Sequence, residues 1–278
     1  MRIYKLLQGL LIEVDSDFYH IAETDWDSFI NDDQLHEKAK KAIQQLKPIT
    51  NAKDLLATQL DAPMSTQELW ASGVTYFRSK QGRQEESKSA GGADFYARVY
   101  EAERPELFFK ATRNRTVGNG GLVRIRKDST WDVPEPELVL LMSSSGKIIG
   151  YTIGNDMSSR SIEGENPLYL PQAKSYDGCA ALGPCILVAE QPLPKDTKIE
   201  LKINRDEKQV FAGEIEINQI KRGFEELAGF LFRECSFPTG ALLMTGTGIV
   251  PDSSFTLRSG DEIVIHVDAI GTLVNKVA

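Results

Sequence analysis

Two acidic residues stand at the start of an apolar stretch of the chain. Glu135 and Glu137 directly precede the apolar residues 138–142. Side chains two apart on a strand point to the same face, so both carboxylates would meet where a strand enters a core. A hard divalent cation such as Mg²⁺, Mn²⁺ or Ca²⁺ relieves the repulsion between two carboxylates and prefers oxygen ligands. The alternative is a solvated strand face that needs no ion.

Later residues add a third acid and a cation. Residues 148–153 form a second apolar run, and Asp156 follows it. If the two runs pair as a hairpin, Asp156 lies near Glu135 and Glu137. Lys174 precedes a glycine-containing apolar run. Apolar surroundings and a nearby metal lower the pKa of an ammonium group, which suits it to proton transfer. The alternative for Lys174 is a solvated loop.

The elements that must hold these residues are mainly short strands punctuated by glycine and proline. An apolar stripe at helical spacing predicts one helix near residues 224–231. Strands with an occasional helix are typical of a β-rich α+β fold rather than of alternating βαβ units. No GxGxxG or GxxxxGKS loop follows a strand, which argues against a nucleotide cofactor. The predicted strands cover residues 133–142, 147–153, 186–190, 199–204, 210–217, 263–267 and 272–277.

The first sixty or so residues have a pattern of their own. Two short apolar runs, 2–7 and 10–14, predict a hairpin, and three-to-four spacing predicts a helix over 35–46. A proline-containing stretch that suits a domain boundary follows. We therefore predict a small α/β domain, residues 1–64, and a larger domain, residues 65–278.

Composition excludes several classes of protein. The chain has 278 residues, of which 41% are hydrophobic and 26% charged, as in ordinary globular proteins. A formal charge of −8 argues against nucleic-acid binding. No window approaches the ~20 apolar residues of a membrane span. Three cysteines without CxxC spacing argue against a structural zinc site or a disulfide framework. We expect a soluble, cytoplasmic protein without nucleic-acid or membrane partners.

Ordered motifs make the chain recognisable. They are Glu135-Pro-Glu137-Leu, Gly150-Tyr-Thr-Ile-Gly-Asn-Asp156-Met-Ser-Ser-Arg160, Ala173-Lys174-Ser-Tyr, Leu182-Gly183-Pro184 and Thr245-Gly246-Thr247-Gly248. Together they resemble the fumarylacetoacetate hydrolase superfamily, from about residue 70 to the C-terminus. The resemblance implies a β-roll catalytic domain, a homo-oligomer (dimer or tetramer) and a 2-oxo acid or 1,3-dicarbonyl substrate. It also implies a divalent metal, Mg²⁺ or else Mn²⁺ or Ca²⁺, held by Glu135, Glu137 and Asp156.

One stretch separates the branches of this superfamily. Its hydrolases usually carry Gly-x-Asn-Tyr-x-x-His-x-x-Glu, whose His–Glu pair activates a water. The matching stretch begins at Gly73, with Ser79 and Gly82 in place of the histidine and the glutamate. Without an imidazole to deprotonate water, classical C–C bond hydrolysis is disfavoured.

Other segments resemble the 2-keto-3-deoxy-D-arabinonate dehydratases. These are residues 100–112 and 165–172, although Ser161 replaces a usual aspartate. The dehydratases have a glutamate near the metal, at the position of Glu106. The resemblance implies a Mg-dependent hydro-lyase of pentose catabolism that converts a 2-keto-3-deoxy sugar acid into 2,5-dioxopentanoate.

The chemistry needs a metal, a base and an acid. Glu106 would be the general base or the acid for the leaving hydroxyl, and Lys174 would stabilise the enolate oxygen or shuttle protons; the two roles are exchangeable. The alternative for Glu106 is a surface acid paired with Arg104 or Lys110. The expected substrate contacts are Ser72, Gly73, Arg78, Lys110 and Thr247.

Further alternatives stay open. Thr247 could serve only the turn of its glycine-rich loop. Residues 79–104 fit a mobile lid or a solvated loop equally well. The protein could instead hydrolyse an acylpyruvate or a fumarylacetoacetate-like diketo acid, or be a non-catalytic homologue.

Overall fold

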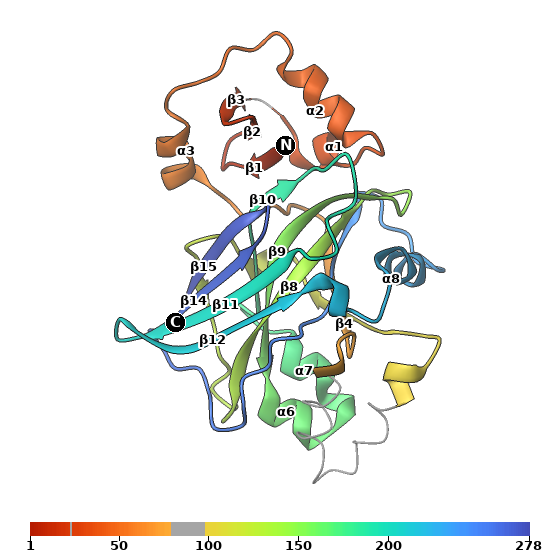
Figure 1. The fold of residues 1–278 in the computed structure, drawn as a ribbon, viewed down its shortest axis with the longest axis vertical. Helices are drawn as coiled ribbons and strands as arrows, with labels where there is room; N and C mark the ends of the chain where they lie inside the picture. Colours follow the sequence, from red (N-terminus) through yellow and green to blue (C-terminus); the bar gives the residue numbers. More distant parts are fainter. Residues whose placement is uncertain (23, 79–97) are drawn as a thin grey trace.

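The fold is a mixed α+β arrangement rich in strands, as the sequence predicts (Figure 1). The computed structural model describes residues 1–278 except residue 23 and residues 79–97. Most of the expected lid, residues 79–104, therefore lies outside the described residues. Within the described part of the chain, no helix is long and apolar enough to cross a bilayer.

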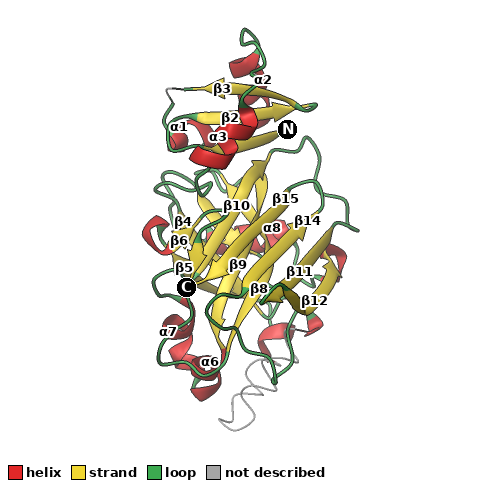
Figure 2. Ribbon diagram, turned by 90° about the vertical axis from the view of Figure 1, so that its left-hand side faces the viewer, coloured by secondary structure: helices red, strands yellow, loops and turns green. Residues whose placement is uncertain are grey.

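A ten-stranded sheet runs through the molecule (Figure 2). Its strands are mostly antiparallel, but β13 and β4 run parallel to each other. In spatial order the strands are β3 (Asp17–Ile21), β2 (Leu10–Val14), β1 (Arg2–Lys5), β10 (Ala180–Leu187), β9 (Ile148–Ser159), β8 (Asp132–Met142), β13 (Ala241–Met244), β4 (Glu68–Gly73) and β5 (Glu106–Ala111), with β6 (Thr116–Val117) beside β10.

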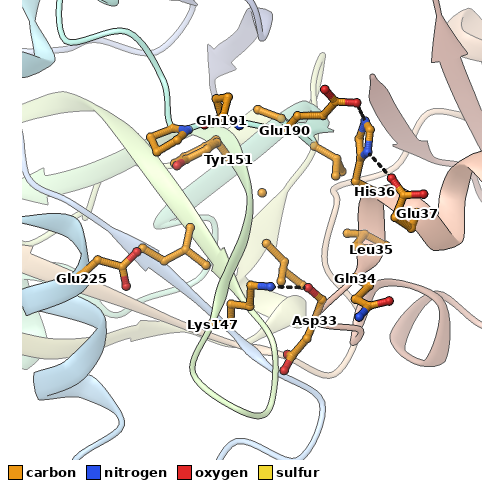
Figure 3. Close-up of a pocket in the computed structure, with 16 residues that line it drawn as sticks. Asp33, Gln34, Leu35, His36, Glu37, Lys147, Tyr151, Glu190, Gln191 and Glu225 are labelled. Carbon is orange, nitrogen blue, oxygen red and sulfur yellow. Dashed lines mark hydrogen bonds and ion pairs between the residues drawn. The ribbon is translucent and has the colours of Figure 1, made fainter.

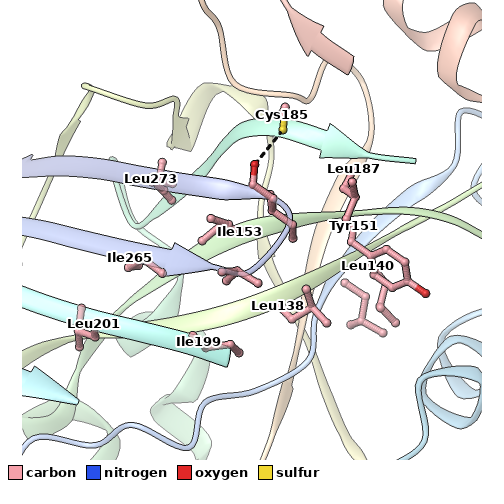
Figure 4. Packing of buried hydrophobic residues seen from close by; sticks show 14 of the residues in the cluster. Leu138, Leu140, Tyr151, Ile153, Cys185, Leu187, Ile199, Leu201, Ile265 and Leu273 are labelled. Atoms are coloured by element: carbon pink, nitrogen blue, oxygen red, sulfur yellow. Dashed lines mark hydrogen bonds between the residues drawn. The ribbon is translucent and has the colours of Figure 1, made fainter. Parts of the chain in front are cut away.

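A five-stranded sheet packs against one face of the large sheet. Its order is β12 (Lys208–Glu216), β11 (Lys198–Arg205), β14 (Glu262–Val267), β15 (Gly271–Val277) and β7 (Leu122–Val123). Leu138 and Ile153 of the large sheet meet Leu201 and Ile265 of the small one in a buried apolar layer (Figure 4). This layer holds the two sheets face to face.

The helices lie around the sheets. α1 and α2 pack their apolar side chains, among them Phe29 and Leu35, in a second core on the opposite face of the large sheet. The helical segments are α1 (Trp26–Ile30), α2 (Leu35–Ile43), α3 (Ala52–Gln59), α6 (Arg160–Glu165), α7 (Leu170–Lys174) and α8 (Phe224–Leu231), with 3₁₀ turns at Arg113–Arg115, Pro167–Tyr169 and Ile217–Gln219.

Strand β8 lies between these two cores and is buried along its whole length. Leu138 and Leu140 point toward the small sheet, whereas Val139 and Leu141 belong to the second core. A strand covered on both faces buries its side chains at successive positions, so all of them are apolar. This explains the sequence of residues 138–142.

The sequence predicts the long strands and two of the helices, with errors at their ends. β9 continues to Ser159 rather than ending near residue 153, and β10 begins at Ala180 rather than at 186. Both segments are rich in small and polar residues, which hide their strand character. α2 ends at Ile43 instead of residue 46. The sequence patterns did not predict strands β3, β4, β5, β6, β7 and β13 or helices α1, α3, α6 and α7.

The N-terminal strands belong to the same sheet as the rest of the protein. Ile3 of β1 stands opposite Ile186 of β10, and the hairpin of β1 and β2 forms as expected. The division into domains 1–64 and 65–278 stays a prediction.

Gly154 of β9 should be intolerant of a side chain. A Cβ atom there would lie 2.6 Å from Val139 Cγ2 and 2.8 Å from Met244 Cε. We expect Gly154→Val to lower the free energy of unfolding by roughly 1–3 kcal/mol, measured by urea denaturation. Gly229→Ala is the control, because nothing lies within 4 Å of its added Cβ. In helix α8 that change should raise stability by about 0.5–1 kcal/mol. An unchanged midpoint for Gly154→Val would contradict this packing.

Candidate active site

Three buried carboxylates converge where β8 and β9 pair. Glu135 stands opposite Asp156, and Glu137 opposite Gly154, so all three acids share one face of the sheet. One oxygen from each carboxylate lies within 4.8 Å of the others. Each of the three side chains is at most 5% exposed. The convergence expected from a hairpin is therefore present, with Asp156 inside the second strand rather than after it.

Cations neutralise part of this charge. Lys174 Nζ lies 2.6 Å from Glu135 Oε2 and 2.9 Å from Asp156 Oδ2. Arg160 Nη2 donates to Glu135 Oε1 at 2.7 Å. Lys110 Nζ lies 2.5 Å from Asp156 Oδ1. Both oxygens of Glu135 and both oxygens of Asp156 therefore face a cation.

Glu137 is the least compensated of the three acids. Its Oε2 accepts the backbone N–H of Gly246 at 2.5 Å. Burial raises the pKa of Glu137 well above its ordinary value, and the carboxylates of Asp156 and Glu135 raise it further, against the opposing effect of Lys174. Burial would also raise the pKa of Asp156, but the ammonium groups beside it bring that pKa below its ordinary value.

This donor set fits a hard divalent cation. It offers only carboxylate oxygens, and they come from two paired strands. Burial, together with the neighbouring carboxylates, favours a proton on Glu137. Mg²⁺, Mn²⁺ and Ca²⁺ all prefer such ligands. Glu135, Glu137 and Asp156 are therefore the residues that could hold a metal.

Strand β5 supplies a second wall. Glu106, Phe108 and Lys110 are spaced two apart and so occupy one face of this strand. Phe108 lines the cavity at the carboxylates, and its ring centre lies 5.7 Å from Lys174 Nζ. Glu106 pairs in register with Gly73, and an added Cβ at Gly73 would lie 1.8 Å from Glu106 Oε2. The absence of a side chain at Gly73 thus leaves room for the Glu106 carboxylate. Gly73 lines the cavity, whereas Glu106 lies beside it and is not among the lining residues.

The ends of β4 and β13 form the third wall. Ser72, Gly73, Val74 and Thr247 line the cavity together with the carboxylates, Arg160 and Lys174. The Ser72 hydroxyl donates to Met244 O at 3.0 Å. Thr247 Oγ1 bonds within its own turn, accepting from the backbone N–H of residue 249 at 3.2 Å. The turn role is therefore seen, and Thr247 also lines the cavity, whereas its contact with a substrate stays a prediction. The cavity is small, with a volume of about 10 Å³.

Two of the expected substrate contacts do not line this cavity. Arg78 is partly exposed and is not among the lining residues. Lys110 is fully buried behind Asp156, and its ammonium also donates to Met157 O at 2.9 Å. Lys110 therefore contacts the carboxylate rather than the cavity.

The sequence interpretation left out several neighbours of the carboxylates. Ser158 lies two residues after Asp156 on the same strand face, and its Oγ is 2.5 Å from Lys174 Nζ. Glu163, one helical turn after Arg160, lies 3.4 Å from the same ammonium. Strand and helix periods applied to the motif around Asp156 could have found both. Val74 was also missed; it has φ of 55°, a strained value for a β-branched residue.

A larger cavity, about 450 Å³, lies elsewhere (Figure 3). It is lined by the start of α2, the start of β9 and the loop after β10. Its charged groups pair with one another or with backbone: His36 lies between Glu37 and Glu190, and Lys147 donates to Asp33 O. No group of three or more metal-ligating side chains is found there among the described residues. The chemistry therefore points to the smaller cavity.

Comparison with known proteins places the chain in a family. Residues 77–278 match the model of the fumarylacetoacetate (FAA) hydrolase C-terminal region. The chain belongs to the fumarylacetoacetate hydrolase family.

Particular relatives are dehydratases by name. The chain is 46% identical over 216 residues to a probable 2-keto-3-deoxyxylonate dehydratase of Haloferax volcanii, which covers 77% of this chain and 73% of that protein. It is 42% identical over 221 residues to the 2-dehydro-3-deoxy-D-arabinonate dehydratase of Saccharolobus solfataricus, covering 79% and 74%. A solved 2-keto-3-deoxy-D-arabinonate dehydratase, complexed with magnesium and 2,5-dioxopentanoate, matches with a TM-score of 0.85 and 34% identity over 100% of this chain and 98% of that one.

Metal binding at the three carboxylates should release a proton. Because the pKa of Glu137 is raised, this carboxyl keeps its proton at pH values where an ordinary glutamate has lost it, and a divalent ion must displace that proton. We expect the affinity for Mn²⁺ to rise with pH above the range in which an ordinary glutamate titrates. Calorimetry in buffers of different ionisation enthalpy measures the proton release. Glu137→Gln should abolish that release; an affinity independent of pH would contradict the assignment.

Proposed function

We propose that this protein is a metal-dependent hydro-lyase that removes water from a 2-keto-3-deoxy pentonate and forms 2,5-dioxopentanoate. The observation that carries the proposal is the buried triad of Glu135, Glu137 and Asp156, with Lys174 in contact with two of its members. The Glu106 carboxylate lies against Gly73, which lines the same cavity. Identities of 46% and 42% to proteins named as dehydratases of such acids support the same reaction.

The triad would hold the metal, with Mg²⁺ as the proposed ion. A divalent ion there supplies a Lewis acid that polarises the 2-oxo group and makes the neighbouring C3–H bond more acidic. The protein's part is to fix three oxygen ligands on a rigid strand pair and to exclude water. β8 and β9 do this because both strands are buried on both faces.

Lys174 is proposed to act at the oxygen on C2. Its ammonium touches two of the three carboxylates, so it is the cation placed at the end of the cavity where the keto acid is bound. There it donates a hydrogen bond to the oxygen on which negative charge develops as the C3 proton leaves.

Glu106 is proposed to move the protons. Its carboxylate lies over Gly73, on the wall formed by β4 and β5 rather than among the metal ligands. It takes a proton from C3 and gives it to the hydroxyl that leaves C4, so one water departs and a C3–C4 double bond forms. A second transfer removes a proton from C5 and returns one to C3, which gives an enol with a C4–C5 double bond. Loss of the enol O–H proton and protonation of C4 then give the aldehyde. No water is consumed, so the reaction needs no imidazole to activate one.

Three further expectations belong to this proposal. The substrate is a small 2-oxo acid, the assembly is a homodimer or homotetramer, and Ser72, Gly73 and Thr247 contact the substrate from the third wall. Lys110 supports Asp156 from behind.

A product assay separates dehydration from hydrolysis. We expect the protein with Mg²⁺ to convert 2-keto-3-deoxy pentonates to 2,5-dioxopentanoate, detected as an aldehyde, and a chelator to abolish turnover. Acylpyruvates are tested in parallel. Release of a carboxylic acid from an acylpyruvate, with no aldehyde from the pentonates, would establish a hydrolase instead.

Removing either proposed catalytic group should slow the reaction strongly. We expect Glu106→Gln and Lys174→Met each to lower kcat by roughly 10²–10⁴-fold, because each removes a group that acts in the transition state. Glu103→Gln is the matched control, because Glu103 is exposed and lies outside the cavity. Near-normal turnover in either variant would remove that residue from the mechanism.

A further inference from the structure

Oxygen atoms of two kinds lie near the Lys174 ammonium in the described part of the chain: those of proposed metal ligands and those of other residues. Glu135 Oε2 at 2.6 Å and Asp156 Oδ2 at 2.9 Å belong to proposed metal ligands. Ser158 Oγ at 2.5 Å and Glu163 Oε1 at 3.4 Å do not. Glu163 is thus the carboxylate beside Lys174 that is outside the triad.

A divalent ion and the Lys174 ammonium compete for the same oxygens. Glu135 has its other oxygen on Arg160, and Asp156 has its other oxygen on Lys110. Once an ion binds these two carboxylates, Lys174 loses two partners and faces a like charge a few ångströms away. In a site where Lys174 is 1% exposed, that repulsion is screened little by water.

We propose that Glu163 is a positioning residue, the counter-charge that holds the Lys174 ammonium when a divalent ion takes Glu135 and Asp156. This inference rests on the proposed metal-dependent dehydration and deepens it. Glu163 keeps the Lys174 ammonium at the edge of the metal site, beside the oxygen on C2 of the substrate. Lys174 then does not block the oxygens of Glu135 and Asp156 that bind the ion.

The local structure suits this role. Helix α6 begins where β9 ends, and Ser159 caps it by accepting the N–H of Ile162 at 3.3 Å. The turn places Glu163 at 2% exposure with Oε2 3.7 Å from Arg160 Nε. A buried carboxylate destabilises the protein unless it is paired. The position of Glu163 beside two cations therefore indicates that it balances their charge.

The balance of charges at the proposed metal site also supports a counter-charge role for Glu163. Carboxylates around the cavity outnumber the cations by two, which equals the charge of one divalent ion. The carboxylates are Glu106, Glu135, Glu137, Asp156 and Glu163, and the cations are Lys110, Arg160 and Lys174. Without Glu163 the metal-bound site would carry an uncompensated positive charge.

Metal titration without substrate tests the proposal. We expect Glu163→Gln to weaken Mn²⁺ binding at least about tenfold, measured by calorimetry, because Lys174 then stays on the ligands. Glu163→Asp, which restores the carboxylate one carbon shorter, should recover part of the affinity. Glu165→Gln, an exposed position on the same helix, should bind like the wild type. Circular dichroism checks that each variant is folded.

A double-mutant cycle separates this role from a general loss of negative charge. In the Lys174→Met background Glu163→Gln should change Mn²⁺ affinity far less, because the ammonium that Glu163 holds is gone. An equal loss in both backgrounds would overturn the proposal, as would wild-type affinity in Glu163→Gln. With substrate, Glu163→Gln should lower kcat more than it raises KM.

The outcomes distinguish the two proposals. A wild-type protein that binds no divalent ion would overturn the proposed function together with this inference. Metal binding that depends on Glu163 and Lys174, in a protein that yields no aldehyde from any pentonate, would overturn the reaction and leave the positioning role intact.

Discussion

The repulsion among three buried carboxylates is the constraint on which the rest of the site depends. Glu135, Glu137 and Asp156 are brought together by the register of two paired strands, in a place from which water is largely excluded. Such a cluster is tolerable only with compensating charge. Lys110, Lys174 and Arg160 supply three positive charges, and these cations contact Glu135 and Asp156, which leaves Glu137 as the least compensated acid.

The two cores hold this unfavourable cluster in position. β8 and β9 have apolar side chains on both faces along most of their length, so their register cannot slip without exposing one core or the other. The acids therefore lie toward one end of a strand pair whose register is fixed by packing farther along the two strands. Burial of apolar surface some residues away offsets the unfavourable free energy of bringing the like charges together.

Family and reaction are separate questions for this fold. The carboxylate triad can grip a keto acid whichever bond is then broken, so the outcome depends on the groups around it. Here the second wall carries Glu106 over Gly73, and the turn after β9 carries Glu163 beside Lys174. In the proposed mechanism Glu106 moves protons and Glu163 holds the Lys174 ammonium, which suits elimination of water rather than addition of water.

The sequence by itself determined the strand-rich fold class, the strands β8, β11, β12 and β14, and the convergence of Glu135, Glu137 and Asp156, because periodicity and spacing along a strand are local properties. It erred at the ends of β9 and β10 and did not predict β3, β4, β5, β6, β7, β13, α1, α3, α6 and α7, which are short or have weak patterns. It also could not place Lys110 behind Asp156 or Glu163 beside Lys174. Those contacts join residues of different elements, and only tertiary packing decides which charges face one another.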